Sequence, residues 1–157
     1  MIRSEQGASA VEFALIAPIL FILTFGTIEF ALLLFDKAVV TNASREGARA
    51  AIVYDTDGTD YTPLSINEIK AVVTNYANGY LVNVGRPGDN ILTSENIVIT
   101  YFDSSGNEVS EPESGGDVMV EITFLYDFLV FPNLAKLIGG TFDGTIDLVG
   151  ITVMRME

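Results

Sequence analysis

The sequence predicts an α+β protein in which a long N-terminal helix, apolar enough to span a membrane, continues into a small soluble domain. Three observations predict this fold. The run Ala14–Phe35 contains one formally charged residue, Glu29, and as a helix it can span about 30 Å of hydrocarbon. Residues 66–80 show helical apolar spacing, and residues 97–102 and 118–126 alternate as strands do. Together they predict a second short helix packed on a small antiparallel sheet.

The first helix is expected from about Ala8 to Tyr54, with a transmembrane part at about 13–35 and a soluble half at 36–54. The apolar run is too long for the core of a secretory signal peptide, so we expect it to be retained as an anchor. In the soluble half, residues at three- and four-residue spacing predict one packing face: Phe35, Val39, Ala43, Gly47, Ala50 and Tyr54. Lys37 and Ser44 are expected on the opposite side.

The second helix is introduced by a capping box, in which Ser65 is followed three residues later by Glu68. Asn78-Gly79 is expected to begin its end. Its apolar face is predicted to hold Ile66, Ile69, Val73, Tyr76 and Tyr80. This amphipathic pattern places the helix on the sheet.

The remaining residues predict the strands and their connections. Asp103–Asn107 is a hairpin-like turn after the first strand, and Glu108–Asp117 reads as a polar loop. The clearest strand should bury Val118, Val120, Ile122, Phe124 and Tyr126. An apolar connection at 128–140, with a short helix after Pro132, leads to a final strand at Thr145–Arg155. Aromatic residues in this region are expected in the core, and a partner-binding patch is the alternative.

Composition excludes several classes of function. The chain has 157 residues and a formal net charge of −13, so it lacks the basic clusters that nucleic acids require. It has no cysteine, which excludes disulfides and thiol chemistry, and no histidine, the commonest general base and metal ligand. The sequence shows no nucleophile with its base, no phosphate-binding glycine loop and no metal-ligand set. We therefore expect neither an enzyme nor a cofactor.

Two acidic clusters are candidates for cation or partner binding. Asp55, Asp57 and Asp60 surround Gly58, and closely spaced carboxylates on a loop suit Ca²⁺. Their order differs from that of an EF-hand, so a solvated turn is the favoured interpretation. The acidic residues at 108–117 are likewise interpreted as a solvated loop, with a basic partner as the alternative. A hydrolase using paired carboxylates ranks last, because no such pair is placed in a recognisable site.

Glu12 stands near the start of the apolar run, where a charged side chain costs roughly 2.5–3.5 kcal/mol. Such a residue needs either a partner or a route to water. Glu12 can therefore form an ion pair or snorkel to the membrane interface. Pro18 removes one helical hydrogen bond and can loosen the helix. Glu29 can pair with Lys37 of the same or a neighbouring chain, but the two are eight residues apart in sequence.

The N-terminal residues resemble one known family. Gly7 followed by four small or apolar residues and then Glu12-Phe13 resembles the cleavage site of type IV pilin-like proteins, and in particular the TadE-like pseudopilins of tight-adherence (Flp-type) pili. Further similarities are Val11-Glu12-Phe13-Ala14 with Pro18 beyond it, Ile28-Glu29, Arg45-Glu46-Gly47-Ala48-Arg49, and the C-terminal Val153–Glu157. The similarity is specific over the helix and looser over the sheet.

The resemblance implies a pilin-like fold with a prepilin leader at 1–7, a long helix at 8–54 and an extracytoplasmic α+β domain at 55–157. A membrane aspartyl prepilin peptidase would cut between Gly7 and Ala8. Glycine suits this position because an extended backbone can then approach closely. Cleavage creates an α-amino group on Ala8, which is mostly protonated at neutral pH and can pair with Glu12 of a neighbouring subunit. Pro18 and Gly47 would serve helix packing.

By the same resemblance, the protein is expected to be a non-enzymatic minor pseudopilin for assembly or initiation of a tight-adherence pilus. It would cross the bacterial inner membrane once, with its C-terminal domain in the periplasm or at the cell surface, and either prime the pilus or enter it. Its expected partners are the prepilin peptidase, membrane lipid, the assembly platform, and a TadF-like pseudopilin or the major Flp-type pilin. The alternative is a bitopic scaffold or envelope-binding protein with an uncleaved anchor.

Overall fold

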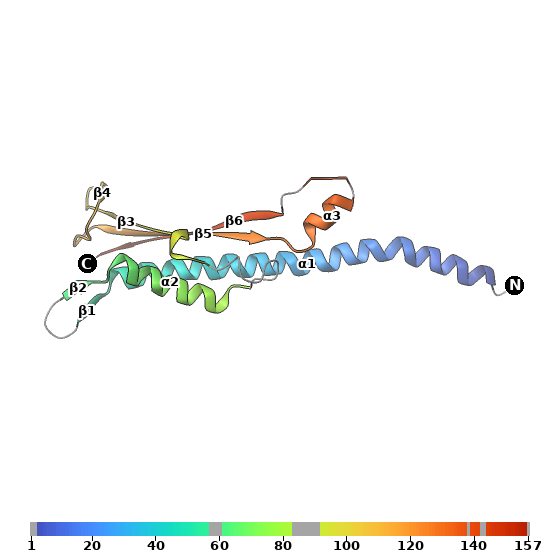
Figure 1. Cartoon of the computed structure of the whole chain (residues 1–157), viewed down its shortest axis with the longest axis horizontal. Coiled ribbons are helices and arrows are strands. Elements are labelled where there is room, and N and C mark those ends of the chain that lie inside the picture. The colour runs from blue at the N-terminus through green and yellow to red at the C-terminus, as the bar shows by residue number, and fades with distance from the viewer. Residues whose placement is uncertain (1–2, 57–60, 83–91, 138, 142–143, 157) are drawn as a thin grey trace. The chain divides into compact units, whose positions relative to one another are not determined.

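The computed structural model of the chain describes residues 3–56, 61–82, 92–137, 139–141 and 144–156 (Figure 1). The chain divides into two compact units, Met1–Leu33 with Phe128–Gly144 and Leu34–Asp127 with Thr145–Glu157. The elements in chain order are α1 (Arg3–Ile52), β1 (Tyr54–Thr56), β2 (Tyr61–Pro63), α2 (Ile66–Tyr80), the 3-10 turn η1 (Ser94–Asn96), β3 (Ile97–Phe102), β4 (Glu108–Val109), β5 (Asp117–Asp127), α3 (Phe131–Leu137) and β6 (Thr145–Arg155). A long apolar helix, a shorter helix and a small antiparallel sheet confirm the predicted α+β class.

Helix α1 is the one helix among the described residues that is long and apolar enough to cross a membrane. It begins at Arg3 rather than at the expected Ala8, so the segment interpreted as a leader is helical from that residue on. It continues through Pro18 and ends at Ile52, and Tyr54 starts β1 instead of closing the helix. The helix contributes residues to both compact units.

The four-stranded sheet lies in the second unit and has the order β4-β3-β5-β6, with antiparallel neighbours throughout. Strands β5 and β6 pair over their full length, from Asp117 opposite Arg155 to Asp127 opposite Thr145. The predicted turn after β3 is present, because the Asp103 N–H donates to the Asn107 carbonyl at 2.8 Å. It leads into β4, so the start of the expected polar loop is a short edge strand instead.

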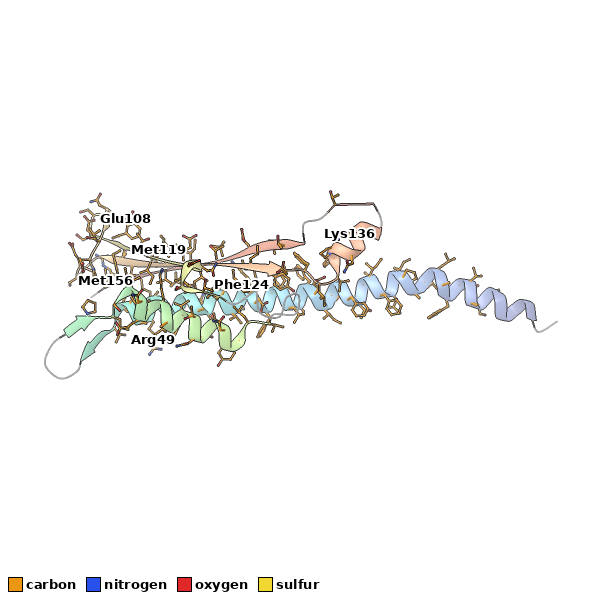
Figure 2. The ribbon with its side chains drawn as sticks, in the orientation of Figure 1. Arg49, Glu108, Met119, Phe124, Lys136 and Met156 are labelled. Atoms are coloured by element: carbon orange, nitrogen blue, oxygen red, sulfur yellow. The ribbon has the colours of Figure 1, made fainter. Side chains whose placement is uncertain are left out.

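One face of the sheet is buried, as the alternation in β5 predicts. Figure 2 labels Phe124 on the buried face and Met119 on the opposite face of this strand. The buried members of β5 are Val118, Val120, Ile122, Phe124 and Tyr126. The core of the second unit therefore lies between this face and the helices packed on it.

Helix α2 has the predicted capping box, since Ser65 Oγ accepts from the Glu68 N–H and Glu68 Oε2 accepts from the Ser65 N–H. Its buried residues are Ile69, Val73 and Ala77. The predicted apolar face is wrong at both ends, because Ile66 and Tyr80 are 41% and 59% exposed. The helix ends at Tyr80, directly after Asn78-Gly79, as we expected. Asn78 also binds the backbone of Leu92 through its side chain, with one donated and one accepted hydrogen bond of 3.1 Å each.

The soluble half of α1 buries a face rotated from the predicted one. Phe35 is 47% exposed, whereas Ser44, expected on the polar side, is fully buried. Ser44 Oγ lies 2.8 Å from the Thr41 carbonyl and 2.7 Å from Thr152 Oγ1, so its hydroxyl keeps hydrogen bonds inside the core. The buried residues of this half are Asp36, Val39, Val40, Ala43, Ser44, Gly47, Ala48 and Ala51.

The first unit contains the N-terminal part of α1 and the connection between β5 and β6. Helix α3 begins at Phe131, one residue before the proline after which a short helix was expected. The Phe128 N–H donates to the Gly144 carbonyl at 2.7 Å, which closes the connection at its base. The rings of Phe128 and Phe131 meet edge to face at 5.7 Å.

Candidate functional site

The predicted cleavage site lies near the exposed start of α1. Gly7 and Ala8 are both exposed, and a Cβ placed on Gly7 would have no atom within 4 Å. Glu12 is also exposed, one and a half turns further along the same helix. In the helical conformation the Gly7–Ala8 peptide bond is part of α1. A protease that reads an extended backbone must therefore open the first turns of this helix.

The helix that follows presents an uncovered apolar surface. None of the residues 7–28 is buried, and Pro18 lies within this exposed stretch. Phe13 and Leu15 are each 69% exposed, and Leu23 is 64% exposed. Single exposed apolar side chains are ordinary, but a continuous surface of this kind indicates contact with lipid or another protein. Within this stretch the Thr27 hydroxyl is satisfied by its own helix, because it donates to the Leu23 carbonyl at 2.7 Å.

Glu29 is the exception on this helix, because it is 3% exposed and binds the backbone of the β5–α3 connection. Its Oε1 accepts from the N–H groups of Leu129 and Val130, the latter at 3.0 Å. Its Oε2 accepts from Val130 at 3.2 Å and from Phe131 at 3.1 Å. Three consecutive backbone donors thus stabilise the carboxylate, as they do in anion-binding turns.

Within the chain Glu29 and Lys37 each have another partner, and pairing of Glu29 with Lys37 of a neighbouring chain stays a prediction. Lys37 Nζ donates to the Val149 carbonyl on β6, while Glu29 binds residues of the other compact unit of the chain. Sequence reasoning missed the acceptor role of Glu29, because its partners are backbone groups about a hundred residues away. One sequence feature could have pointed to this role of Glu29. The residues 128–131 form an uncharged apolar run directly after a strand.

Gly47 is buried where α1, α2 and β5 meet in the second unit. A Cβ built on Gly47 would lie 2.4 Å from Val73 Cγ2 and 3.2 Å from Val120 Cγ1. Both values are shorter than ordinary carbon–carbon contacts of about 3.5–4.0 Å. The absent side chain lets the helix, its neighbour and the sheet approach this closely.

The predicted cation loop falls largely outside the described residues. Asp57 and Asp60 are among those not described, and Asp55 pairs through its backbone with Thr62 in the β1–β2 hairpin. Within the described ranges, no group of three acidic, histidine or cysteine side chains could hold a metal ion.

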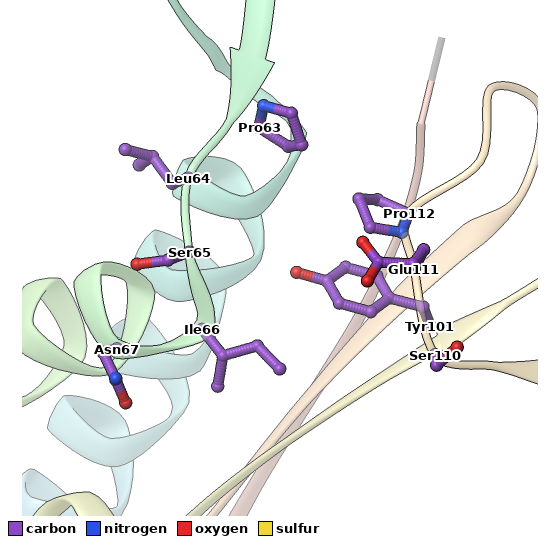
Figure 3. Close-up of a pocket in the computed structure, with 9 residues that line it drawn as sticks. All are labelled: Pro63, Leu64, Ser65, Ile66, Asn67, Tyr101, Ser110, Glu111 and Pro112. Carbon is purple, nitrogen blue, oxygen red and sulfur yellow. The ribbon is translucent and has the colours of Figure 1, made fainter.

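A shallow pocket of about 280 Å³ lies between the start of α2 and the segment after β4. Figure 3 shows the Tyr101 hydroxyl pointing across it toward the segment that contains Ser65. Burial, and to a lesser extent the nearby Glu111 carboxylate, raise the pKa of Tyr101, so this hydroxyl stays protonated. The pocket is at the small end of the range for ligand sites and brings together no nucleophile with a base.

Comparison with known proteins gives one match. Residues 7–49 match the model of a family described as TadE-like protein. No curated protein and no solved structure matches the chain. The matched segment contains Gly7, Glu12, Pro18, Glu29 and Gly47. This match confirms the resemblance noted from the N-terminal motifs: over residues 7–49 the chain is similar to TadE-like proteins.

Proposed function

We propose that the protein is a minor pseudopilin that a prepilin peptidase cuts between Gly7 and Ala8, and that then helps to assemble or initiate a tight-adherence pilus. The observation that carries this proposal is the position of Gly7 and Glu12 at the head of an uncovered apolar helix, inside the segment that matches the family. The helix anchors the chain in the bacterial inner membrane, with the domain 55–157 on the extracytoplasmic side. Lipid covers the helix before assembly, and neighbouring subunits cover it afterwards.

Cleavage changes the charge balance at the head of the helix. The new α-amino group on Ala8 has a reference pKa of about 7.7–8.0 and is mostly protonated at neutral pH. Glu12 is exposed and lies four residues away, so its carboxylate is accessible to the amine of a neighbouring subunit. Pairing offsets the cost of removing both charges from water and fixes the axial register of the two helices.

The rest of the chain supports a minor component rather than the main filament subunit. The soluble region is much longer than in the short major pilins of tight-adherence systems. The first residue of the mature chain would be Ala8, whereas ordinary type IV pilins have a large apolar residue at this position. Gly47 keeps the soluble half of α1 close to α2 and the sheet, so this half of the helix is part of the core of the second unit. This domain then presents a surface to a TadF-like pseudopilin, the major pilin or the assembly platform.

Processing is tested by co-expressing the chain with and without an active prepilin peptidase and measuring intact mass. The peptidase should remove the seven residues from Met1 to Gly7, and Gly7→Ala should block the cut. Gly79→Ala is the matched control, because that glycine also has no neighbour within 4 Å and belongs to the second unit. An unchanged mass of the natural chain, beside a control substrate that is cut, would contradict the proposal.

Assembly is tested separately with Glu12→Gln. This variant should be cut normally, because the role of Glu12 begins after cleavage, but it should lose association with pilin subunits in membrane cross-linking. Normal cross-linking of the variant would exclude the pairing role.

The second candidate is a bitopic scaffold with an uncleaved anchor. It is favoured by one observation, the helical conformation of residues 3–8, which holds the scissile bond in a form that peptidases do not cut. It predicts an unchanged mass with the peptidase and no effect of Gly7→Ala on size or on pilus formation.

A further inference from the structure

We propose that residues 128–137 form a membrane insert, which enters the lipid leaflet on the side of the C-terminal domain, beside the end of the α1 span. The inference rests on the membrane anchoring in the proposed function but not on cleavage at Gly7. The insert consists of the start of the β5–β6 connection and helix α3. Its contacts with Gly26, Glu29 and Gly144 all lie within the first compact unit.

The position of Glu29 sets the depth of the insert. Glu29 binds the N–H groups of residues 129–131, so these residues lie at its level along α1. The apolar run of α1 ends at Phe35, six residues later, which is about 9 Å along the helix axis. Segments that bind at the boundary of headgroups and acyl chains are buried by about 5–10 Å. The bound loop is therefore at the depth of that boundary.

The backbone N–H groups at this level are satisfied without water. Phe128 donates to the Gly144 carbonyl, residues 129–131 donate to Glu29, and Pro132 has no N–H group to satisfy. Irregular backbone is tolerated at membrane depth only where protein groups supply the hydrogen bonds. The Glu29 carboxylate lies inside the apolar run and requires hydrogen-bond donors, which lipid cannot provide. Glu29 therefore supplies the acceptors for the N–H groups of residues 129–131, and these groups supply the donors for its carboxylate.

The side chains of the insert suit acyl chains on its uncovered side. Leu129 and Phe131 are 48% and 37% exposed, and Val130 between them is half-buried. Residues 128–135 carry no formal charge, and Lys136 follows on α3, where Figure 2 labels it, with an exposed side chain that can reach the headgroups. Phe131 also reaches α1, with its ring tip 3.6 Å from where a Cβ of Gly26 would stand. The exposed apolar surface is thus continuous with that of the span.

The test uses single cysteines in a chain that has no natural cysteine. An environment-sensitive fluorophore is attached at Leu129→Cys and at Phe131→Cys in vesicles of phosphatidylethanolamine and phosphatidylglycerol that contain nitroxide-labelled lipid. Phe21→Cys is the control inside the span, at 57% exposure. Val98→Cys, on the sheet at 53% exposure, is matched to Leu129 in exposure but lies in the second unit.

The insert predicts blue-shifted emission and quenching by nitroxide lipid at Leu129→Cys and Phe131→Cys, as at Phe21→Cys, with neither effect at Val98→Cys. If the Leu129 and Phe131 labels behave like Val98 while Phe21 is quenched, the insert is overturned and the anchor stands. If Phe21 itself is not quenched, the anchor fails and the insert fails with it. In nanodiscs that hold one chain each, the quenching should persist, and its loss there would show that a second copy covers this surface.

Glu29→Gln tests the attachment of the insert to α1. The glutamine side chain keeps one acceptor oxygen, but its NH2 group replaces the other oxygen and would face backbone N–H groups, which are also donors. Quenching at Leu129→Cys should fall, while quenching at Phe21→Cys should stay constant. Unchanged quenching at Leu129 would show that Glu29 does not hold the segment in the leaflet and would overturn this part of the proposal.

Discussion

Gly47→Ala offers a sharp test of how the soluble half of α1 joins the domain. The added Cβ would lie 2.4 Å from Val73 Cγ2, so the two atoms must separate by more than 1 Å to reach an ordinary contact. Val73 is fully buried, and its branched side chain is stiff, so α2 itself has to move. Overpacking of this kind costs typically about 1–3 kcal/mol.

A second term opposes that cost. Alanine is favoured over glycine inside a helix by about 1 kcal/mol, and this gain applies to Gly47→Ala as well. A contact of 2.4 Å belongs at the upper end of the overpacking range, about 2–3 kcal/mol, so we expect a net loss of about 1–2 kcal/mol in the free energy of unfolding. For a domain of this size, each 1 kcal/mol corresponds to a fall in the unfolding midpoint of about 4–8 °C.

Gly79→Ala is the matched control for this effect. Gly79 also lies in a helix, but a Cβ there meets no atom within 4 Å, so only the propensity gain remains. We expect Gly79→Ala to raise stability by about 0.5–1 kcal/mol. The same substitution should thus change the unfolding midpoint in opposite directions at the two positions.

The assay is thermal unfolding of the full chain in lipid nanodiscs, followed by near-UV circular dichroism. All six tyrosines lie between Tyr54 and Tyr126, so the signal reports on the second unit. In a Val73→Ala background the nearest clash is removed, and Gly47→Ala should become neutral or stabilising. If Gly47→Ala is as stable as the natural chain while Gly79→Ala shows its gain, the reasoning about this contact is refuted.

Three further predictions concern the same unit. Gly150→Ala should cost about 1–3 kcal/mol in the same melt, because its Cβ would lie 2.8 Å from the Val40 carbonyl oxygen, and backbone cannot rotate away. Asn78→Asp should cost about 1–3 kcal/mol in urea unfolding, because the buried Leu92 carbonyl loses the amide that donates to it. The hydroxyl and N–H of Ser65 lower the pKa of Glu68, so the ionised carboxylate stabilises the fold above its unfolded pKa, and this contribution is lost as pH falls through the folded pKa. Glu68→Gln should therefore flatten the acid side of a plot of stability against pH.

Each of these predictions has a control on the same element or of the same type. Gly79→Ala again controls for the glycine substitution, and a midpoint of Gly150→Ala at or above that of the natural chain would contradict the contact with Val40. Asn67→Asp changes an exposed asparagine of α2, and an equal loss at both asparagines would remove the special role of Asn78. For Glu68, an unchanged acid side in the variant would show that the capping box does not couple its protonation to folding.

The strands were predictable because their residues depend on near neighbours. In a half-buried antiparallel strand, apolar and polar residues alternate with a period of two. This alternation predicted the buried residues of β5, and the limits of β6 also agree with the sequence prediction. The capping box of α2 was predictable for the same reason, because its two residues are three positions apart. The α+β class followed from these local signals.

The failures occur where polar groups have partners far away in sequence. Ser44 looked like a surface residue, yet Thr152 gives its hydroxyl a partner in the core. Asn78 lies at the end of α2 as expected, but the two hydrogen bonds of its amide with Leu92 were not predicted. Glu29 looked like a candidate for an ion pair, but it accepts from backbone groups, which have no sequence signature. The Gly7–Glu12 motif and Gly47 were identifiable from sequence, whereas the role of Glu29 required the three-dimensional arrangement.

The connection between β5 and β6 has a consequence for how the chain folds. Asp127 and Thr145 are paired at the end of the two strands, where a two-residue turn would suffice to join them. The natural connection, Phe128–Gly144, is roughly eight times longer than such a turn. Each doubling of a flexible loop costs about 0.6 kcal/mol in closure entropy, so the longer path costs about 2 kcal/mol. The sheet would fold more readily with a tight hairpin, and the chain bears this penalty for a segment that the hairpin itself does not need.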